Sequence, residues 1–136
     1  MKPAARGQSK HRKVMVPEPV DNVPHRTTSF GTMMKEARYA TCVAGKWHIS
    51  QDPSEFGFDT NFGSNRSGAP RGGYFSPYRN PQLSDGHKVE HLTDRLGKEV
   101  SNWIVENKDK PFFVYFPFYS VHTPIQAHED LTQKYQ

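Results

Sequence analysis

The chain has 136 residues, enough for one small domain. Only 34% are hydrophobic, and ten Gly and eleven Pro favour a thin core with much loop. No stretch approaches the ~20 apolar residues of a membrane span. The formal net charge of +4 is a property of the first 13 residues, which hold five Lys/Arg and no acid. A basic tail can touch nucleic acid or an anionic membrane, but a solvated tail is the favoured interpretation and no specific nucleic-acid binding is expected.

The first 26 residues are expected to be irregular, because prolines at positions 17, 19 and 24 remove backbone donors and favour extended neighbours. Residues 1–20 contain no continuous apolar segment of the kind that a signal peptide needs, so compartment and oligomeric state stay open. Cys42 is the only cysteine, which excludes an internal disulfide, and its apolar neighbours indicate a small buried thiol.

A first helix is expected from about Ser29 to Arg38, with Thr28 or Ser29 capping its exposed amides. Its apolar side chains repeat at helical spacing and are interpreted as core residues: Phe30, Met33, Met34 and Ala37.

Residues 39–45 form a run of small and apolar residues typical of a short, fully buried strand. Lys46, Trp47 and His48 follow at the expected carboxyl end of this strand. Ligands of open α/β sheets bind at the carboxyl ends of the strands, so position alone marks Lys46 and His48 as candidates.

Residues 50–91 are rich in Gly, Pro, Asn and Ser, with six aromatic residues spread among them. Loops of this length are usually functional or disordered, and the aromatics favour an ordered excursion that packs on the rest of the fold. Arg66, Arg71 and Arg79 could reach an anion, although surface charge is the favoured interpretation.

The second helix is the clearest element, from about Leu92 to Asn107, with apolar residues at i, i+4, i+8, i+11 and i+12. Thr93 is its expected N-cap, and Pro111 blocks continuation. The apolar run Phe112–Phe116 lacks alternation, which predicts a central parallel strand covered on both faces. A last helix is expected from Ala127 to Gln136, cut short by the end of the chain.

Helix followed by strand, twice, indicates an α/β fold: an incomplete, mostly parallel central sheet flanked by helices. His122, in the segment Ser120–Pro124, follows the second strand as Lys46 and His48 follow the first. Lysine offers a compact positive charge to sulfate or phosphate oxygens, and imidazole exchanges a proton near neutral pH. These three residues therefore predict half of a site for an oxyanion ester, with plain surface or core placement as the alternative.

Two histidine pairs have spacings that could bind a metal: His122 with His128, and His87 with His91. Neither pair comes with a cysteine or a set of carboxylates, so a zinc site is not favoured. No P-loop, Rossmann glycine pattern or Gly-x-Ser-x-Gly nucleophile elbow is present.

Several short motifs occur in a fixed order between Thr27 and Tyr135. The most specific is Gly-Lys-Trp-His at 45–48, and the others are 34–37 with 39–41, 57–59, 92–96, 110–115 and 121–124. In this order and spacing the chain resembles the sulfatase family, of the alkaline-phosphatase-like superfamily.

The resemblance implies hydrolysis of sulfate esters by a formylglycine, made from the Cys or Ser of a Cys/Ser-x-Pro-x-Arg motif, beside a calcium ion held by acidic residues and an Asn. By motif match, Lys46 would contact the sulfate and the nucleophile, and His48 would orient the formylglycine diol. His122 would bind sulfate or protonate the leaving oxygen. The substrate would be a sulfated small molecule or glycan, and relatives are commonly exported, periplasmic or lysosomal.

The chain departs from the family in three ways. The Cys/Ser-x-Pro-x-Arg motif, the N-terminal acidic metal ligands and the later Asp-Asn pair are all absent. Cys42 lacks the following Pro and Arg, so it is not the expected nucleophile. Arg38 stands where relatives often have Gly, at a helix end that favours the left-handed conformation, and local strain is expected there.

We therefore interpret residues 27–136 as a partial sulfatase-like catalytic domain after an irregular basic segment over 1–26, and we expect the isolated chain to be inactive. The alternatives are a non-catalytic sulfate- or glycan-binding remnant and a non-functional truncated gene product. A phosphatase or phosphonate hydrolase of the same superfamily matches less well. A partial sheet exposes edges and apolar surface, so marginal stability or aggregation is also expected.

Overall fold

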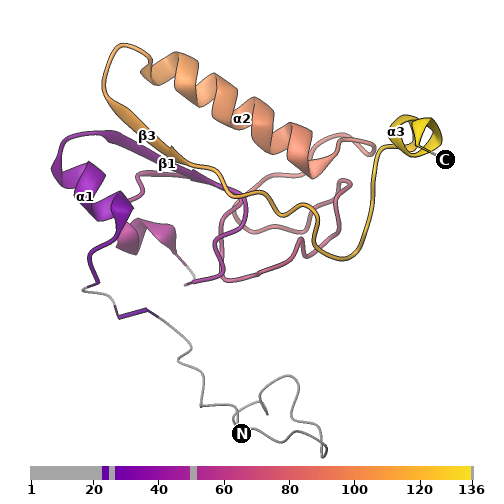
Figure 1. Cartoon of the computed structure of the whole chain (residues 1–136), viewed down its shortest axis with the longest axis horizontal. Helices are drawn as coiled ribbons and strands as arrows, with labels where there is room; N and C mark the ends of the chain where they lie inside the picture. The colour runs from indigo at the N-terminus through magenta and orange to yellow at the C-terminus, as the bar shows by residue number, and fades with distance from the viewer. Residues whose placement is uncertain (1–22, 25–26, 50–51, 136) are drawn as a thin grey trace, which may run out of the picture.

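The computed structural model describes residues 23–24, 27–49 and 52–135 (Figure 1). Most of the basic segment 1–26 lies outside these ranges, so its irregular structure stays a prediction. The described elements, in chain order, are α1 (Phe30–Glu36), β1 (Ala40–Ala44), the 3-10 helix η1 (Pro53–Phe56), β2 (Thr60–Phe62), α2 (Leu92–Asn107), β3 (Phe112–Tyr115) and α3 (Glu129–Lys134).

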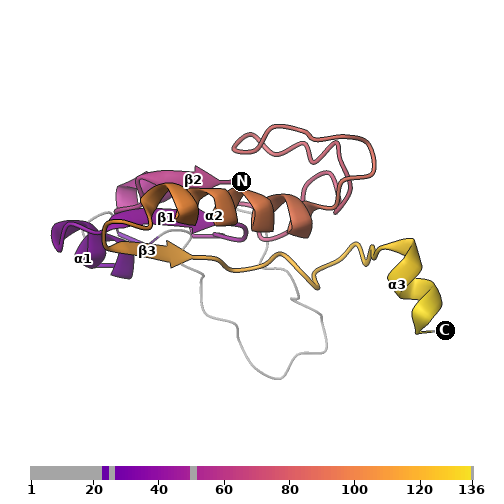
Figure 2. The ribbon, with the colours of Figure 1, turned by 90° about the horizontal axis from the view of Figure 1, so that it is seen from above.

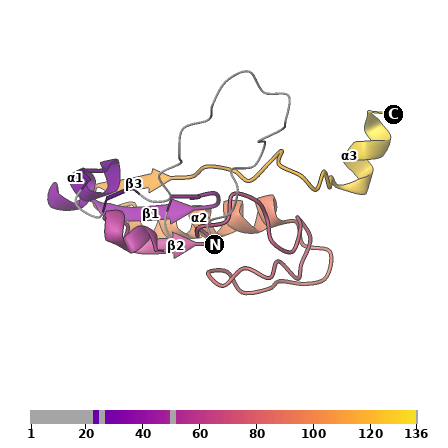
Figure 3. The same ribbon diagram turned by 90° about the horizontal axis from the view of Figure 1, so that it is seen from below.

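The three strands form one parallel sheet in the order β2-β1-β3. Helix α2 lies on one side of this sheet, and α1 with η1 lies on the other (Figure 1). Figures 2 and 3 show the sheet from above and from below, with α3 set apart from it at the far end of an extended segment after β3. The predicted α/β class with parallel strands and flanking helices is confirmed.

Strand β1 is the centre of the sheet and is buried on both faces. Val43 belongs to a cluster on the α1 side with Trp47, Phe56 and Phe58. Burial of the Cys42 thiol is complete, as the sequence predicts.

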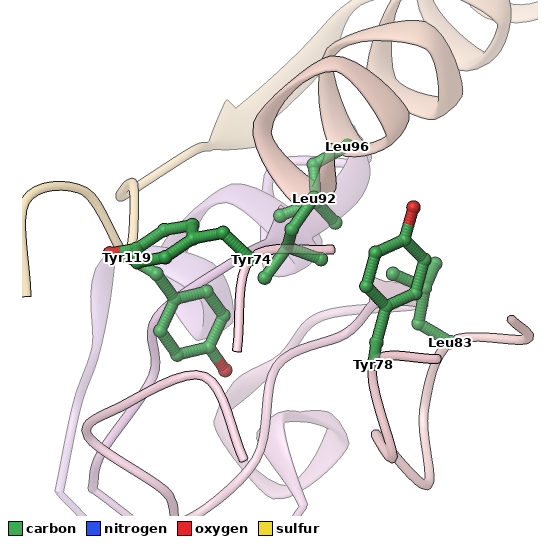
Figure 4. Close-up of a cluster of buried hydrophobic side chains, with 6 residues drawn as sticks. All are labelled: Tyr74, Tyr78, Leu83, Leu92, Leu96 and Tyr119. Atoms are coloured by element: carbon green, nitrogen blue, oxygen red, sulfur yellow. The ribbon is translucent and has the colours of Figure 1, made fainter. Parts of the chain in front are cut away.

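The opposite side of the sheet is covered by α2, and the long segment before this helix packs against its first turns. Helix α2 contributes Leu92 and Leu96, and the loop and the C-terminal segment contribute further residues to this cluster (Figure 4). These partners are Tyr74, Tyr78, Leu83 and Tyr119. The prediction that residues 50–91 form an ordered, packed excursion is therefore confirmed for the described residues 52–91.

Strand β3 is an edge strand, and its predicted central place is wrong. It pairs only with β1 among the described strands, and its residues are half-buried or exposed. The lack of apolar alternation has another cause: Phe112 contacts Trp103 of α2 on one face, while Phe113 stacks near Phe58 on the other. Aromatic side chains thus contact both faces of β3, although one of its edges is unpaired among the described strands.

Helix α1 begins at a capping box, in which the Ser29 side chain accepts from the Thr32 N–H and the Thr32 hydroxyl accepts from the Ser29 N–H. Its predicted core face is wrong, because Phe30 is 72% exposed and Met33 51% exposed. The helix packs instead through buried Gly31. Phe30 and Met33 line an open apolar hollow of about 400 Å³ beside Trp47, Phe58 and Tyr115.

Arg38, just after α1, has a φ of 64°, in the left-handed region that costs a side-chain-bearing residue free energy. The local strain expected at this position is confirmed.

Helix α2 has the predicted bounds and apolar stripe, with Leu92, Leu96, Val100 and Trp103 buried. The predicted N-cap is wrong. His91 is the N-cap, and its ring accepts from the Thr93 N–H, so Thr93 already lies inside the helix. An imidazole with a free lone pair satisfies an amide as a hydroxyl would.

Candidate active site

The carboxyl end of β1 is joined to both neighbouring strands by backbone hydrogen bonds. The Gly45 N–H donates to the Phe62 carbonyl at 3.0 Å, and the Lys46 N–H donates to the Pro117 carbonyl at 2.8 Å. Gly45 has a φ of 91°, and a β-carbon there would lie 2.2 Å from the Pro117 oxygen, so a side chain does not fit. This close approach places Lys46 beside the segment that leaves β3.

The side chains of the tetrad at 45–48 differ in their burial. Trp47 is buried and makes edge contacts with Phe56 and Phe58. Lys46 is half-buried and His48 exposed. Neither the ammonium nor the imidazole forms a hydrogen bond or ion pair with any residue in the described ranges, so both are available to a ligand.

His48 is held in an unusual backbone conformation. Its φ is 62°, and its N–H donates to the Asn65 carbonyl beyond β2 at 3.1 Å. The ring lies against the backbone of Gly68, where a β-carbon would come within 2.5 Å of Nδ1. Non-glycine residues in this region cost of order 1–3 kcal/mol and cluster at functional sites. The surrounding loop therefore fixes where this imidazole stands.

His122 is exposed, on the segment that follows β3. Its N–H donates to the Tyr119 carbonyl, its carbonyl accepts from the Tyr74 hydroxyl at 3.2 Å, and Nδ1 lies 2.8 Å from the Thr123 carbonyl. The Tyr119 hydroxyl in turn donates to the Gly63 carbonyl at 3.0 Å. Contacts to the end of β2 and to the long loop thus anchor this segment.

The three predicted residues lie on segments leaving the carboxyl ends of adjacent parallel strands. Nothing in the described ranges joins their side chains directly, so a bound ligand would be needed to connect them. The segments just beyond the strands, residues 45–49, 63–74 and 116–126, contain no Asp or Glu, while Arg66 and Arg71 are exposed there. Their charge suits an anion.

Comparison with known proteins identifies the family of this chain. The sequence profile of the Sulfatase family matches residues 4–136, almost the whole chain. The chain belongs to the sulfatase family. The segments at 45–48 and 121–124 lie within the matched residues.

Similar sulfatases come from distant organisms. A sulfatase of Formosa agariphila is 44% identical over 59 residues, which cover 42% of this chain and 10% of the relative. An arylsulfatase of Klebsiella aerogenes is 24% identical over 82% of this chain and 27% of the relative. An N-acetylgalactosamine-6-sulfatase of Canis lupus familiaris is 26% identical over 81% and 25%. The chain spans about a quarter or less of the length of these sulfatases.

The described residues just beyond the three strands do not fit a calcium site. Calcium is held by six to eight oxygens, several of them from carboxylates. Residues 45–49, 63–74 and 116–126, which lie just beyond the three strands, carry no carboxylate and present lysine, arginine and histidine instead. These segments therefore supply no carboxylate ligand for calcium.

Cys42 is also excluded as the nucleophile. The thiol is fully buried in β1, and this burial raises the pKa of Cys42 to about 12. Thiolates, not thiols, are the nucleophilic form.

One group of candidate ligands was missed by sequence analysis. His91, Asp94 and His128 bring their ligand atoms within 4.8 Å of one another. The structure thus unites one histidine from each of the two pairs that spacing had singled out, together with a carboxylate. His91 and Asp94 are three apart at the start of a predicted helix, a spacing that could have signalled half of this cluster.

None of the described helices is long and apolar enough to cross a bilayer.

Proposed function

We propose that this chain supplies the sulfate-contacting half of a sulfatase active site, in which a sulfated small molecule or glycan is hydrolysed. The observation that carries the proposal is the placement of Lys46, His48 and His122 beyond adjacent parallel strands, on segments that themselves contain no Asp or Glu. The Lys46 ammonium would neutralise charge on the sulfate oxygens. A fixed cation in a preorganised site stabilises developing negative charge better than water does.

The two histidines would have separate roles. His48, fixed by the Asn65 and Gly68 backbone, would orient the nucleophile, a formylglycine supplied by sequence outside these 136 residues. His122, exposed on its anchored segment, would protonate the leaving oxygen. Because nucleophile and calcium ligands are not among these residues, we propose that the chain alone does not turn over sulfate esters.

Sequencing the gene and transcript on both sides of this reading frame is the first test. A Cys/Ser-x-Pro-x-Arg motif upstream and an Asp-Asn pair downstream, both in frame, would support the proposal. In the longer protein, Lys46→Ala should lower kcat for an aryl sulfate by about 10²–10³-fold, as loss of an oxyanion-stabilising group does. His122→Ala should cost about 10²–10⁴-fold.

The matched control is His87→Ala, because His87 is exposed and lies outside the three strand-end segments. It should leave kcat unchanged. Full activity of Lys46→Ala, or appreciable aryl sulfate turnover by the purified 136-residue chain, would overturn the proposal.

A second candidate, a sulfate- or glycan-binding remnant, is favoured by one observation: the Lys46 and His48 side chains are available although no nucleophile accompanies them. Saturable sulfate binding by the chain, lost in Lys46→Ala and accompanied by stop codons bounding these residues, would select this alternative.

A further inference from the structure

Three metal-ligating side chains from two distant parts of the chain meet at the start of α2. His91 is the N-cap of α2, Asp94 lies in its first turn, and His128 precedes α3. The His128 Nε2 lies 2.8 Å from the Asp94 Oδ2, and the centroids of the two imidazole rings are 4.6 Å apart. We propose that these three residues bind one Zn²⁺ ion.

Both rings are already held in place by aromatic neighbours. The buried His91 ring stacks on Tyr74, with centroids 5.3 Å apart and planes 8° from parallel. Phe75 meets the His91 ring edge-on at 5.1 Å and the His128 ring at 5.9 Å. Two of the three ligands therefore lose little side-chain freedom when an ion binds.

The contacts of the His91 ring that an ion would replace are weak. His91 Nδ1 accepts from the Thr93 N–H at 3.3 Å, and Nε2 lies 3.3 Å from the Gln126 carbonyl. Both exceed the usual ~2.9–3.0 Å of such bonds. Tetrahedral zinc with bonds of about 2.0–2.1 Å separates its ligand atoms by about 3.3 Å. The ligand atoms of the cluster already lie within 4.8 Å of one another.

The donor set selects zinc over the harder ions. Two imidazoles and one carboxylate suit Zn²⁺, and three protein ligands leave a fourth position for water. Calcium and magnesium need more oxygens than the cluster offers. Glu129 and Asp130 follow His128 in the first turn of α3 and add negative charge beside the ion.

A bound ion would fasten the segment after β3 to α2. The contact between the Thr93 and Ser120 hydroxyls, at 3.1 Å, already joins the same two parts. His122 lies between Ser120 and His128, so zinc would restrict the motion of that candidate catalytic segment. The three zinc ligands do not include Lys46, His48 or His122, so zinc binding does not require that the chain act on sulfate esters.

Zinc binding is measured by calorimetric titration of the purified chain with ZnCl₂ at pH 7.5, after treatment with EDTA. We expect one Zn²⁺ per chain and a rise in the thermal midpoint with zinc, since a ligand that binds only the folded state stabilises it. His128→Ala and Asp94→Asn should each weaken binding at least about tenfold, because loss even of an outer-shell partner costs that much.

The matched control is a triple variant, His11→Ala with His25→Ala and His87→Ala, which removes three other histidines and should keep the same affinity. Lys46→Ala should also bind zinc normally, which separates this inference from the proposed function. No saturation up to millimolar zinc, or unchanged affinity in folded His128→Ala, would overturn the proposal. Equally tight binding of Ca²⁺ or Mg²⁺ would contradict the choice of zinc.

Discussion

Gly45 shows how much of the candidate site depends on a single residue. It follows β1 with a φ of 91° and lies against the Pro117 carbonyl, which accepts from the Lys46 N–H. The backbone can come this close only because no side chain intervenes. The missing side chain of Gly45 therefore allows Lys46 to lie beside the segment that carries His122.

Gly45→Ala should destabilise the chain by more than about 2 kcal/mol, since left-handed strain alone costs roughly 1–2 kcal/mol and the Pro117 carbonyl must also move. Gly97→Ala is the control. Gly97 lies within α2 with nothing within 4 Å of its added β-carbon, so alanine there should stabilise by about 0.5–1 kcal/mol. Urea unfolding followed by circular dichroism measures both, and equal midpoints for the two variants would contradict this account.

Among the helices and strands, α2 and β1 follow from local sequence patterns, whereas β2 follows from its pairing with a distant strand. Helical periodicity predicted α2 with its observed bounds, and a run of small and apolar residues predicted β1 as a buried strand. Both patterns lie within the element that they predict. Strand β2 has three residues and half-buried side chains, so no local pattern marked it. Its place is set by parallel pairing with β1, between Cys42 and Thr60 among others.

An ion pair ties three of these elements together. Lys35 of α1 donates to Asp59, just before β2, at 2.5 Å, and the Thr41 hydroxyl of β1 donates to the same carboxylate at 3.0 Å. The hydrogen bond from Lys35 lowers the pKa of Asp59, with the Thr41 bond adding to it against partial burial.

Because the pKa of Asp59 is lower in the folded chain, its contribution to stability is present above the ordinary range of an Asp and is lost as pH falls through the folded pKa. Asp59→Asn should therefore lower the free energy of unfolding by a few tenths to about 1 kcal/mol at pH 7, as for an exposed ion pair. The difference from the parent chain should shrink as pH falls below the ordinary pKa of an Asp. Urea titrations at pH 7, 5 and 3 test this, with exposed Asp109→Asn as the control; a difference as large at pH 3 as at pH 7 would contradict the assignment.

Across the whole molecule, the described residues leave much apolar surface uncovered. Strands β2 and β3 each pair on one side only, and the hollow beside α1 is lined by exposed Phe30 and Met33. Open edges and contiguous apolar patches promote association of chains.

The chain should therefore self-associate at concentrations of tens of micromolar. The double variant Phe30→Glu with Met33→Glu should reduce this association, because it places charge in the hollow without removing buried side chains. Val105→Glu is the matched control, since Val105 is 65% exposed on α2 and does not line the hollow. Sedimentation velocity measures the species present. A monomeric parent chain with a sharp cooperative melt would argue against the prediction.

The sequence by itself determined the α/β class, the bounds of α2, the buried strand β1 and the positions of Lys46, His48 and His122 at strand ends, because each follows from a pattern within a few residues. The tertiary structure decided the edge position of β3, the exposure of Phe30 and the meeting of His91 with His128. The physical reason is that each depends on which distant segment lies alongside: Asp94 and His128 are 34 residues apart, yet share a hydrogen bond. Such pairings are set by packing of the whole chain, and no local period records them.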